Sequence, residues 1–209
     1  MINVVIVDDH SIVRRGFRQI IEETQDIRVV AEVADGPALL AWLRQGRCDI
    51  VVLDLSMPGQ NGLELLEELR SLYPDLAILI LSMHPEDQYA VRVLKSGAAG
   101  YMNKEYAAEF LGPALRKIGS GGRYVSDTLA EMLAFNLGGD GTQAPHESLS
   151  NREFQVLVML AQGKTASAIA DDLSISVKTV STYRARILEK LNLGSNAELV
   201  RYALEKSLI

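Results

Sequence analysis

The sequence has very little cysteine and no long apolar run. Cys48 is the only cysteine among 209 residues, so no intramolecular disulfide can form, and a reducing compartment fits this usage. No apolar stretch reaches the roughly 20 residues that a bilayer-spanning helix needs. The N-terminus runs directly into the strand-like segment 3–7, without the basic region and apolar core of a signal peptide. We therefore expect a cytoplasmic protein with no membrane partner.

The chain has fewer basic than acidic residues, 21 against 27, and the charge is unevenly distributed along it. The net charge is −6. Residues 1–125 carry −4, residues 126–147 have no lysine or arginine and carry −4, and residues 148–209 carry +2. A mildly basic C-terminal segment on an acidic chain is compatible with nucleic-acid binding, although a solvated helical surface would give the same charges.

Strand-like apolar runs alternate with helical patterns over residues 1–120. The predicted strands are residues 4–7, 29–33, 50–54, 76–81 and 98–102. The predicted helices are residues 11–23, 36–43, 61–69, 86–95 and 106–118, the third of them capped by Asn61. Such alternation predicts an α/β fold in which a parallel sheet carries helices on both faces. Periodicity alone leaves the strand order open.

The pattern changes to helix only after a glycine-rich linker. A short helix over residues 126–135 is followed by the linker-like segment 138–145. Ser150 with Glu153, and Ser195 with Glu198, match capping boxes at helix starts. Helical segments follow at about 156–161, 166–173, 177–191 and up to 206, which predicts a small all-α domain of four helices. We therefore divide the chain into residues 1–120, a linker over 121–146, and residues 147–209.

Polar residues follow several of the predicted strands. Asp8 and Asp9 follow the first strand, Asp54 ends the third, Ser82 follows the fourth, and Lys104 lies just past the fifth. In a parallel sheet these strand ends meet at one edge, where open α/β sheets do their chemistry. Three carboxylates gathered there suit Mg²⁺, and a carboxylate can accept a phosphoryl group as a nucleophile. His10 lies beside the acid pair and is interpreted as a surface or cap residue outside the site. His84 is interpreted as a loop residue, with a place in the lining of the phosphate pocket left open.

Two helical segments near the C-terminus fit a helix–turn–helix. A helix over 166–173 and a turn at 174–176 precede a longer helix over 177–191. The expected buried stripe of the longer helix is Val177, Val180, Ile187, Leu188 and Leu191. Hydroxyls and cations on its other face suit a DNA major groove, and the periodicity favours this reading and an ordinary solvated face about equally.

The first segment resembles the receiver domain of two-component response regulators. The resemblance covers residues 2–119 and rests on Asp8-Asp9, on Asp54 with residues 57–59, on Ser82, and on residues 97–101 leading to Lys104. It implies a flavodoxin-like, doubly wound, five-stranded sheet of order 2-1-3-4-5, and phosphorylation of Asp54 by a sensor histidine kinase.

The resemblance also implies a role for each site residue. The implied Mg²⁺ ligands are Asp8, Asp9, Asp54 and the backbone carbonyl of Ser56, with Asp8 acting mainly through water. Lys104 is expected to pair with the carboxylate and then with the phosphate, and Ser82 and Tyr101 are expected to form the switch pair. Glu105 stands where such domains often have a proline, which leaves the path of that loop open.

The C-terminal segment resembles a LuxR-type helix–turn–helix. The resemblance rests on residues 149–153, 164, 169–170, 176–180 and 190–191. Together the two resemblances are similar to the NarL/FixJ family of transcription regulators. By family position the expected base readers are Ser181, Thr182 and Ala185, and the expected phosphate contacts are Lys178, Thr179, Tyr183 and Arg186. Tyr183 and Ala185 differ from residues that many relatives have there, so no target sequence is transferred.

The prediction is a DNA-binding response regulator, not an enzyme, in which phosphorylation of Asp54 promotes dimerisation and promoter binding. The expected partners are a sensor histidine kinase, double-stranded promoter DNA and a second copy of the chain, with RNA polymerase a further candidate. Two alternatives stay open at this point. One is a Mg²⁺-dependent phosphatase, although Ser56 stands where haloacid-dehalogenase-like enzymes have a second acid. The other is a DNA-binding module that works without phosphorylation.

Overall fold

The computed structural model describes residues 1–57, 62–138, 144–206 and 208–209. Contacts divide the chain into two compact units, Met1–Leu133 and Ala134–Ile209, which are described separately. The predicted helix cap Asn61 lies outside the described residues. No helix in these four ranges is long and apolar enough to cross a membrane.

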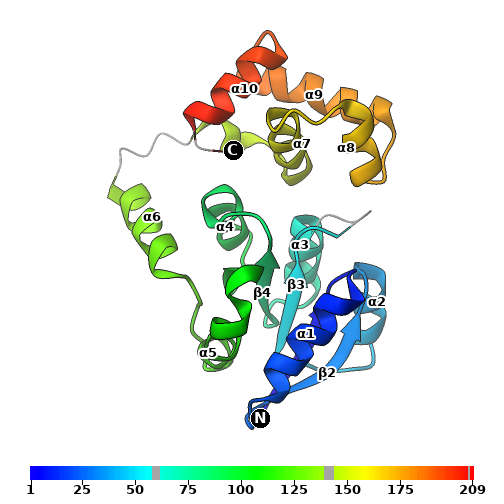
Figure 1. Cartoon of the computed structure of the whole chain (residues 1–209), viewed down its shortest axis with the longest axis vertical. Coiled ribbons are helices and arrows are strands. Elements are labelled where there is room, and N and C mark those ends of the chain that lie inside the picture. The colour runs from blue at the N-terminus through cyan, green and yellow to red at the C-terminus, as the bar shows by residue number, and fades with distance from the viewer. Residues whose placement is uncertain (58–61, 139–143, 207) are drawn as a thin grey trace. The chain divides into compact units, whose positions relative to one another are not determined.

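The N-terminal unit is a parallel sheet with helices on both of its faces (Figure 1). Its strands are β1 (Ile2–Val7), β2 (Ile27–Val33), β3 (Ile50–Asp54), β4 (Ala77–Ser82) and β5 (Gly100–Asn103). The strand order is β2-β1-β3-β4-β5, and every neighbouring pair is parallel. The doubly wound order expected from the resemblance is therefore confirmed. β5 begins two residues later than predicted, because Ala98 and Ala99 serve as its connection to the preceding helix.

The helices of this unit follow the predicted segments closely. They are α1 (Ser11–Glu22), α2 (Gly36–Leu43), α3 (Gly62–Leu72), α4 (Glu86–Lys95), a 3₁₀ turn η1 (Lys104–Tyr106), α5 (Ala107–Gly119) and the first part of α6 (Asp127–Gly138), which continues into the other unit from Ala134. The prediction of a helix at Gly36-Pro37 holds because Asp35 caps it and proline occupies the first turn, where its missing N–H costs no hydrogen bond. With Glu105 after Lys104, the path of that loop is the turn η1, which the Asn103 side chain caps at the Glu105 N–H.

The sheet is buried on both faces. On one face Val4, Ile6, Val52 and Leu79 pack against apolar side chains of α1 and α5. Residues of the opposite parity, such as Val5 and Leu53, are also fully buried, which requires the remaining helices on the other face. This double coverage explains why the strands are almost entirely apolar until they end at the polar edge.

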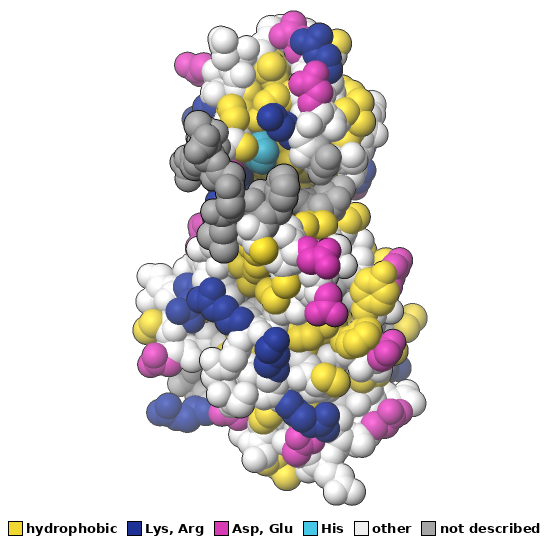
Figure 2. All heavy atoms as spheres, turned by 90° about the vertical axis from the view of Figure 1, so that its left-hand side faces the viewer, with side chains coloured by type: hydrophobic (Ala, Val, Ile, Leu, Met, Phe, Trp, Pro, Cys, Tyr) yellow, Lys and Arg dark blue, Asp and Glu magenta, His cyan; other side chains and the backbone are white. Residues whose placement is uncertain are grey.

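Some large hydrophobic side chains of the N-terminal unit remain exposed. Ile12, Met83 and Tyr106 are 83%, 60% and 57% exposed. Figure 2 shows hydrophobic side chains lying among acidic and basic ones on the surface. All three lie close in sequence to the polar residues that follow the strands: Ile12 near His10, Met83 beside Ser82, and Tyr106 near Lys104.

The C-terminal unit is helical. A 3₁₀ turn η2 (Pro145–Ser148) precedes α7 (Asn151–Ala161), α8 (Ala166–Asp172), α9 (Val177–Leu191) and α10 (Asn196–Glu205). The capping box predicted at Ser150 and Glu153 is present. The one predicted at Ser195 is only half formed. Ser195 caps the Glu198 N–H, but the Glu198 carboxylate accepts from the Gly194 N–H and from the Ser195 hydroxyl instead of from the Ser195 backbone N–H.

Candidate functional site

The predicted acidic site is assembled at the carboxyl edge of the parallel sheet. Asp8 directly follows β1, Asp54 ends β3 and Ser82 ends β4, and these three side chains are almost completely buried, with exposed fractions of 1%, 2% and 0%. Lys104 follows β5 and reaches back into the same edge. The common direction of the strands therefore brings together residues that lie up to 96 positions apart.

The Lys104 ammonium neutralises the two buried carboxylates. Its Nζ lies 2.7 Å from Asp8 Oδ2 and 2.9 Å from Asp54 Oδ2. Burial raises the pKa of Asp54, and the Lys104 charge and the Ser56 N–H bond to Asp54 Oδ1 (3.1 Å) oppose that rise. The site thus holds a carboxylate that has lost most of its hydration and has a cation beside it.

Asp9 and His10 complete an oxygen-rich cluster. One ligand atom from each of Asp8, Asp9, His10 and Asp54 lies within 4.8 Å of the others. Within the described chain, Asp9 Oδ1 is buried and accepts no hydrogen bond, although His10 Nδ1 lies 3.0 Å away. Hard carboxylate oxygens, one of them without a hydrogen bond, fit a divalent cation such as Mg²⁺. His10 is the N-cap residue of α1 and its side chain is 66% exposed, in line with its interpretation as a surface or cap residue. Its backbone N–H donates to Asp8 Oδ1.

Ser82 and Tyr101, the expected switch pair, are linked through His84. The His84 N–H donates to Ser82 Oγ at 3.0 Å, and the Tyr101 hydroxyl donates to the His84 carbonyl at 2.8 Å. Tyr101 is fully buried, and the His84 ring lies 4.8 Å from the ring of Tyr89. His84 lies in the loop after β4, as the sequence indicates, and its backbone connects the two members of the expected switch pair. Backbone groups make both bonds, so no side-chain pattern could have indicated them.

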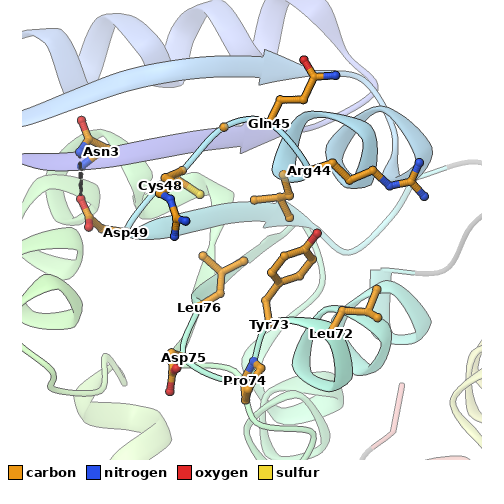
Figure 3. Close-up of a pocket in the computed structure, with 13 residues that line it drawn as sticks. Asn3, Arg44, Gln45, Cys48, Asp49, Leu72, Tyr73, Pro74, Asp75 and Leu76 are labelled. Carbon is orange, nitrogen blue, oxygen red and sulfur yellow. Dashed lines mark hydrogen bonds between the residues drawn. The ribbon is translucent and has the colours of Figure 1, made fainter.

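A pocket lies at the opposite end of the same strands. It has a volume of about 690 Å³ and is lined by Asn3, Cys48, Asp49 and Tyr73, among others, where β1, β3 and β4 begin (Figure 3). Asp49 accepts a hydrogen bond from the Asn3 N–H at 2.7 Å. Burial, together with the Asp49 charge, raises the pKa of Cys48 to about 12, so the thiol is not a thiolate at neutral pH. None of the predicted site residues lines this pocket.

In the C-terminal unit, α8 and α9 form the predicted helix–turn–helix. Ile169, Ala170 and Leu173 are buried, and Ser174 adopts a left-handed conformation (φ 52°) that ends α8. Ser176 then caps α9 by accepting from the Thr179 N–H. These local features set the angle at which α9 leaves the turn.

The predicted DNA-contacting residues share one side of α9. Five of them are exposed: Lys178, Ser181, Thr182, Ala185 and Arg186. Thr179 and Tyr183 are half-buried. The Ser181 and Thr182 hydroxyls donate to the carbonyls four residues earlier, at 3.0 Å each, so they retain acceptor capacity on the exposed surface.

Two members of the predicted buried stripe are not fully buried. Val177 is 46% exposed and Leu188 is half-buried, whereas Val180, Ile187 and Leu191 are buried as expected. Val177 is the first residue of α9, one turn beyond the part of the helix that packs inward. It extends the exposed surface of α9.

An ion pair between an exposed lysine and a buried glutamate holds α9 to α7. Lys190 Nζ lies 2.7 Å from Glu153 Oε2, and the Glu153 carboxylate also accepts from the Ser150 N–H at 2.8 Å. Burial acts to raise the pKa of Glu153, but the bonds from Lys190 and Ser150 outweigh it and hold this pKa below its usual range. The folded domain thus stabilises the ionised form of Glu153.

Comparison with known families assigns both units. Residues 4–116 match the response regulator receiver domain, and residues 147–203 match the bacterial regulatory proteins of the luxR family. The chain is 37% identical over 209 residues to the response regulator UvrY of Escherichia coli K12, covering all of this chain and 96% of UvrY. It is 36% identical to the response regulator GacA of Pseudomonas aeruginosa, covering 100% of this chain and 98% of GacA.

Solved structures agree with these relatives. RcsB of Salmonella enterica serovar Typhimurium, bound to promoter rprA in the presence of the phosphomimetic BeF₃⁻, matches with a TM-score of 0.68 and 29% identity, covering 100% of both chains. A structure of an RcsB–DNA complex matches with a TM-score of 0.60 and 28% identity, covering 100% of this chain and 98% of that one. The receiver fold with its acidic edge, the helix–turn–helix and the relatives matched over nearly their full length all agree. The chain belongs to the NarL/FixJ family of two-component transcription regulators.

Proposed function

We propose that this protein binds promoter DNA as a dimer and is switched by Mg²⁺-dependent phosphorylation of Asp54 by a sensor histidine kinase. The observation that carries the proposal is the buried Asp54 carboxylate, with Lys104 Nζ at 2.9 Å and Ser82 at the end of the neighbouring strand. A nucleophile, a cation and a hydroxyl that could bind phosphate meet at one sheet edge. We assign the receiver domain to residues 1–120, the linker to 121–146 and the DNA-binding domain to 147–209.

The proposed reaction transfers a phosphoryl group to Asp54. A carboxylate oxygen of Asp54 bonds to phosphorus while the P–N bond of the kinase phosphohistidine breaks, and the imidazole leaves. Asp8, Asp9, Asp54 and the Ser56 carbonyl would hold Mg²⁺. When bound, Mg²⁺ supplies positive charge to the transferring oxygens. Lys104 supplies further positive charge after it exchanges part of its contact with the carboxylate for the phosphate.

The phosphorylated state is proposed to differ at Ser82. Its hydroxyl now accepts from the His84 N–H and would turn to donate to a phosphate oxygen. That movement changes the loop whose carbonyl holds Tyr101, and so shifts an equilibrium towards the dimer that binds DNA.

The exposed hydrophobic side chains near the site support docking of a phosphodonor protein. Ile12, Met83 and Tyr106 come from three different loops or helix starts, each within three residues of a site residue in the sequence. A histidine kinase must bring its phosphohistidine to a buried carboxylate, and an apolar contact around the opening would position it. Substituting Ile12 by Asp is therefore expected to slow phosphorylation by the kinase but not by acetyl phosphate.

The surface of α9 supports major-groove binding. Lys178, Thr179, Tyr183 and Arg186 are proposed to contact phosphates, and Ser181, Thr182 and Ala185 to face base edges. The domain matched to the luxR family spans this helix, and RcsB structures of similar fold are bound to DNA. We also propose a cytoplasmic location, with RNA polymerase as a further contact and no catalytic turnover of free substrates.

The test is incubation of the full-length protein with Mg²⁺ and acetyl phosphate, followed by intact-mass measurement and light scattering. We expect one phosphate on the wild type and a shift towards dimer, both abolished in Asp54→Ala and in EDTA. The same preparations are then tested for binding to DNA from the chain's own promoters. Tight binding by Asp54→Ala, with the wild-type response to phosphodonor, would overturn the proposal.

A further inference from the structure

The segment that follows α5 continues the receiver sheet by one residue. The Tyr124 N–H donates to the Ala99 carbonyl at 2.9 Å, and Tyr124 forms a parallel bridge with Gly100 of the edge strand β5. A Cβ at Gly100 would lie 2.7 Å from the Tyr124 carbonyl oxygen, so this close approach requires glycine. The beginning of the expected linker is therefore fixed to the receiver.

The next residues tie helix α6 to helix α4 through one hydroxyl. Ser126 Oγ accepts from the Leu129 N–H at 3.1 Å, which caps α6, and the same hydroxyl donates to Glu86 Oε2 at the start of α4. Leu129 is fully buried within the N-terminal unit. The first turns of α6 thus pack as receiver structure, while α6 from Ala134 onward belongs to the C-terminal unit.

Glu86 lies at the end of the loop that begins at the switch residue Ser82. His84 bonds Ser82 through its N–H and Tyr101 through its carbonyl, and only Pro85 separates His84 from Glu86. A short run of backbone therefore connects Ser82, whose hydroxyl is expected to bind the phosphate, with Glu86, whose carboxylate accepts from the Ser126 hydroxyl. A displacement of this loop moves one partner of the Glu86–Ser126 bond, while Tyr124 stays fixed at β5.

We propose that Glu86 and Ser126 are positioning residues that couple the phosphorylation state of Asp54 to the linker helix. In the structure described, Asp54 is paired with Lys104 and the Glu86–Ser126 bond is made. Phosphorylation draws Ser82 towards Asp54, displaces the loop and breaks the bond. The first turn of α6 then loosens, and the chain entering the C-terminal unit is released. This inference rests on the proposed function, because it needs a phosphate at Asp54.

Hydrogen exchange of the full-length chain, followed by mass spectrometry of peptides covering residues 127–133, tests the coupling. Glu86→Ala removes the bond to Ser126 but keeps the serine cap, so we expect these amides to exchange about three- to tenfold faster in the resting state. Mg²⁺ with beryllofluoride is expected to speed exchange in the wild type by a similar factor, and to add little in Glu86→Ala.

Matched variants separate the bond from general effects on the helix. Glu86→Gln still offers an oxygen to the Ser126 hydroxyl and should exchange as the wild type does. Glu131→Ala, on an exposed position of the same helix, should also leave exchange unchanged. Asp54→Ala should show no response to beryllofluoride.

The outcomes distinguish the two proposals. If Glu86→Ala exchanges at the wild-type rate, or still shows the full wild-type response to beryllofluoride, the coupling is wrong although phosphorylation stands. If the wild type takes no phosphate from acetyl phosphate, the proposed function fails and the coupling with it.

Discussion

The Lys104 ammonium and the Asp54 carboxylate form a buried ion pair, with 2.9 Å between Nζ and Oδ2. Only 10% of the Lys104 side chain and 2% of the Asp54 side chain are exposed. The same ammonium also serves Asp8 at 2.7 Å, so one cation neutralises two carboxylates that water hardly reaches.

Replacing Lys104 by methionine should therefore destabilise the N-terminal unit. Loss of the cation leaves buried carboxylates facing each other, and we expect the free energy of unfolding in EDTA to fall by about 3 kcal/mol. Urea titration followed by the fluorescence of Trp42, the only tryptophan, reports on this unit alone. Millimolar Mg²⁺ should restore part of the loss. Lys117→Met, at an exposed position, is the control, and equal stabilities of the two variants would contradict the role given to Lys104.

A second prediction concerns Gly100 at the edge of the sheet. Gly100→Ala places a Cβ 2.7 Å from the Tyr124 carbonyl oxygen and 3.1 Å from Leu79 Cδ1, so the residue-124 bridge must move. We expect a loss of about 2 kcal/mol in the Trp42-monitored transition. Gly16→Ala is the matched control: nothing lies within 4 Å of its added Cβ, and it lies inside α1, so it should stabilise by about 0.5–1 kcal/mol. Similar effects of the two substitutions would rule out this account.

Tyr101→Phe removes one buried hydrogen bond and little else. The His84 carbonyl loses the hydroxyl that donates to it at 2.8 Å, and the expected cost is about 1 kcal/mol. Phosphorylation by acetyl phosphate, measured by intact mass, should continue, because Tyr101 does not touch the Asp54 carboxylate in any contact described. Tyr73→Phe, in the pocket at the other end of the strands, is the comparison variant. A complete loss of phosphorylation in Tyr101→Phe would show that the Tyr101 hydroxyl has a part in the chemistry.

Acid should weaken the C-terminal unit through Glu153. Since its pKa is lower in the folded domain than the ordinary value of 4.5, the ionised carboxylate contributes stability above that ordinary value. This contribution is lost as the pH falls through the folded pKa. Calorimetry of wild type and Glu153→Gln should give different unfolding temperatures at pH 7, the variant being less stable by about 1–2 kcal/mol. The difference should shrink as the pH falls below 4.5 and through the folded pKa of Glu153, and a constant difference at all pH values would contradict the assignment.

The exposed face of α9 predicts how binding depends on salt. Arg186→Ala and Lys178→Ala should each weaken binding to any duplex and reduce the slope of log K against log salt by about one. Ser181→Ala should instead change the preference among sequences while keeping the slope. Fluorescence anisotropy over a salt series measures both quantities, with Glu189→Ala as a control on the same helix. An unchanged slope in Arg186→Ala would remove Arg186 from the phosphate contacts.

Much of the receiver and its site could be predicted because the signals are local. An apolar run that ends on Asp54 predicts a buried strand with a polar end, and parallel strands place Asp8, Asp54 and Ser82 at one edge. The resemblance added the strand order, which periodicity alone leaves open. What each of these residues does in phosphorylation remains a prediction.

The other features of the structure depend on contacts that the residue types do not indicate. The bonds of His84 to Ser82 and Tyr101 use backbone groups, and the Tyr124 bridge joins two segments through an N–H and a carbonyl. The spacing of Val177 fits a buried stripe, but spacing does not indicate which turns of α9 pack against other helices, and the first turn leaves Val177 exposed. Ser195 and Glu198 satisfy a capping-box pattern, yet the Gly194 N–H competes for the carboxylate.

The bridge at Tyr124 also occupies the start of the edge strand β5, where a strand of another chain could otherwise pair. β5 is an edge strand, and an open edge can pair with a strand from a second molecule and start aggregation. Tyr124 occupies the hydrogen-bonding position beside Gly100, and the chain then turns away into α6. A strand from a second copy therefore cannot pair along the whole length of β5, which disfavours a continued sheet and favours association of two copies through helix surfaces.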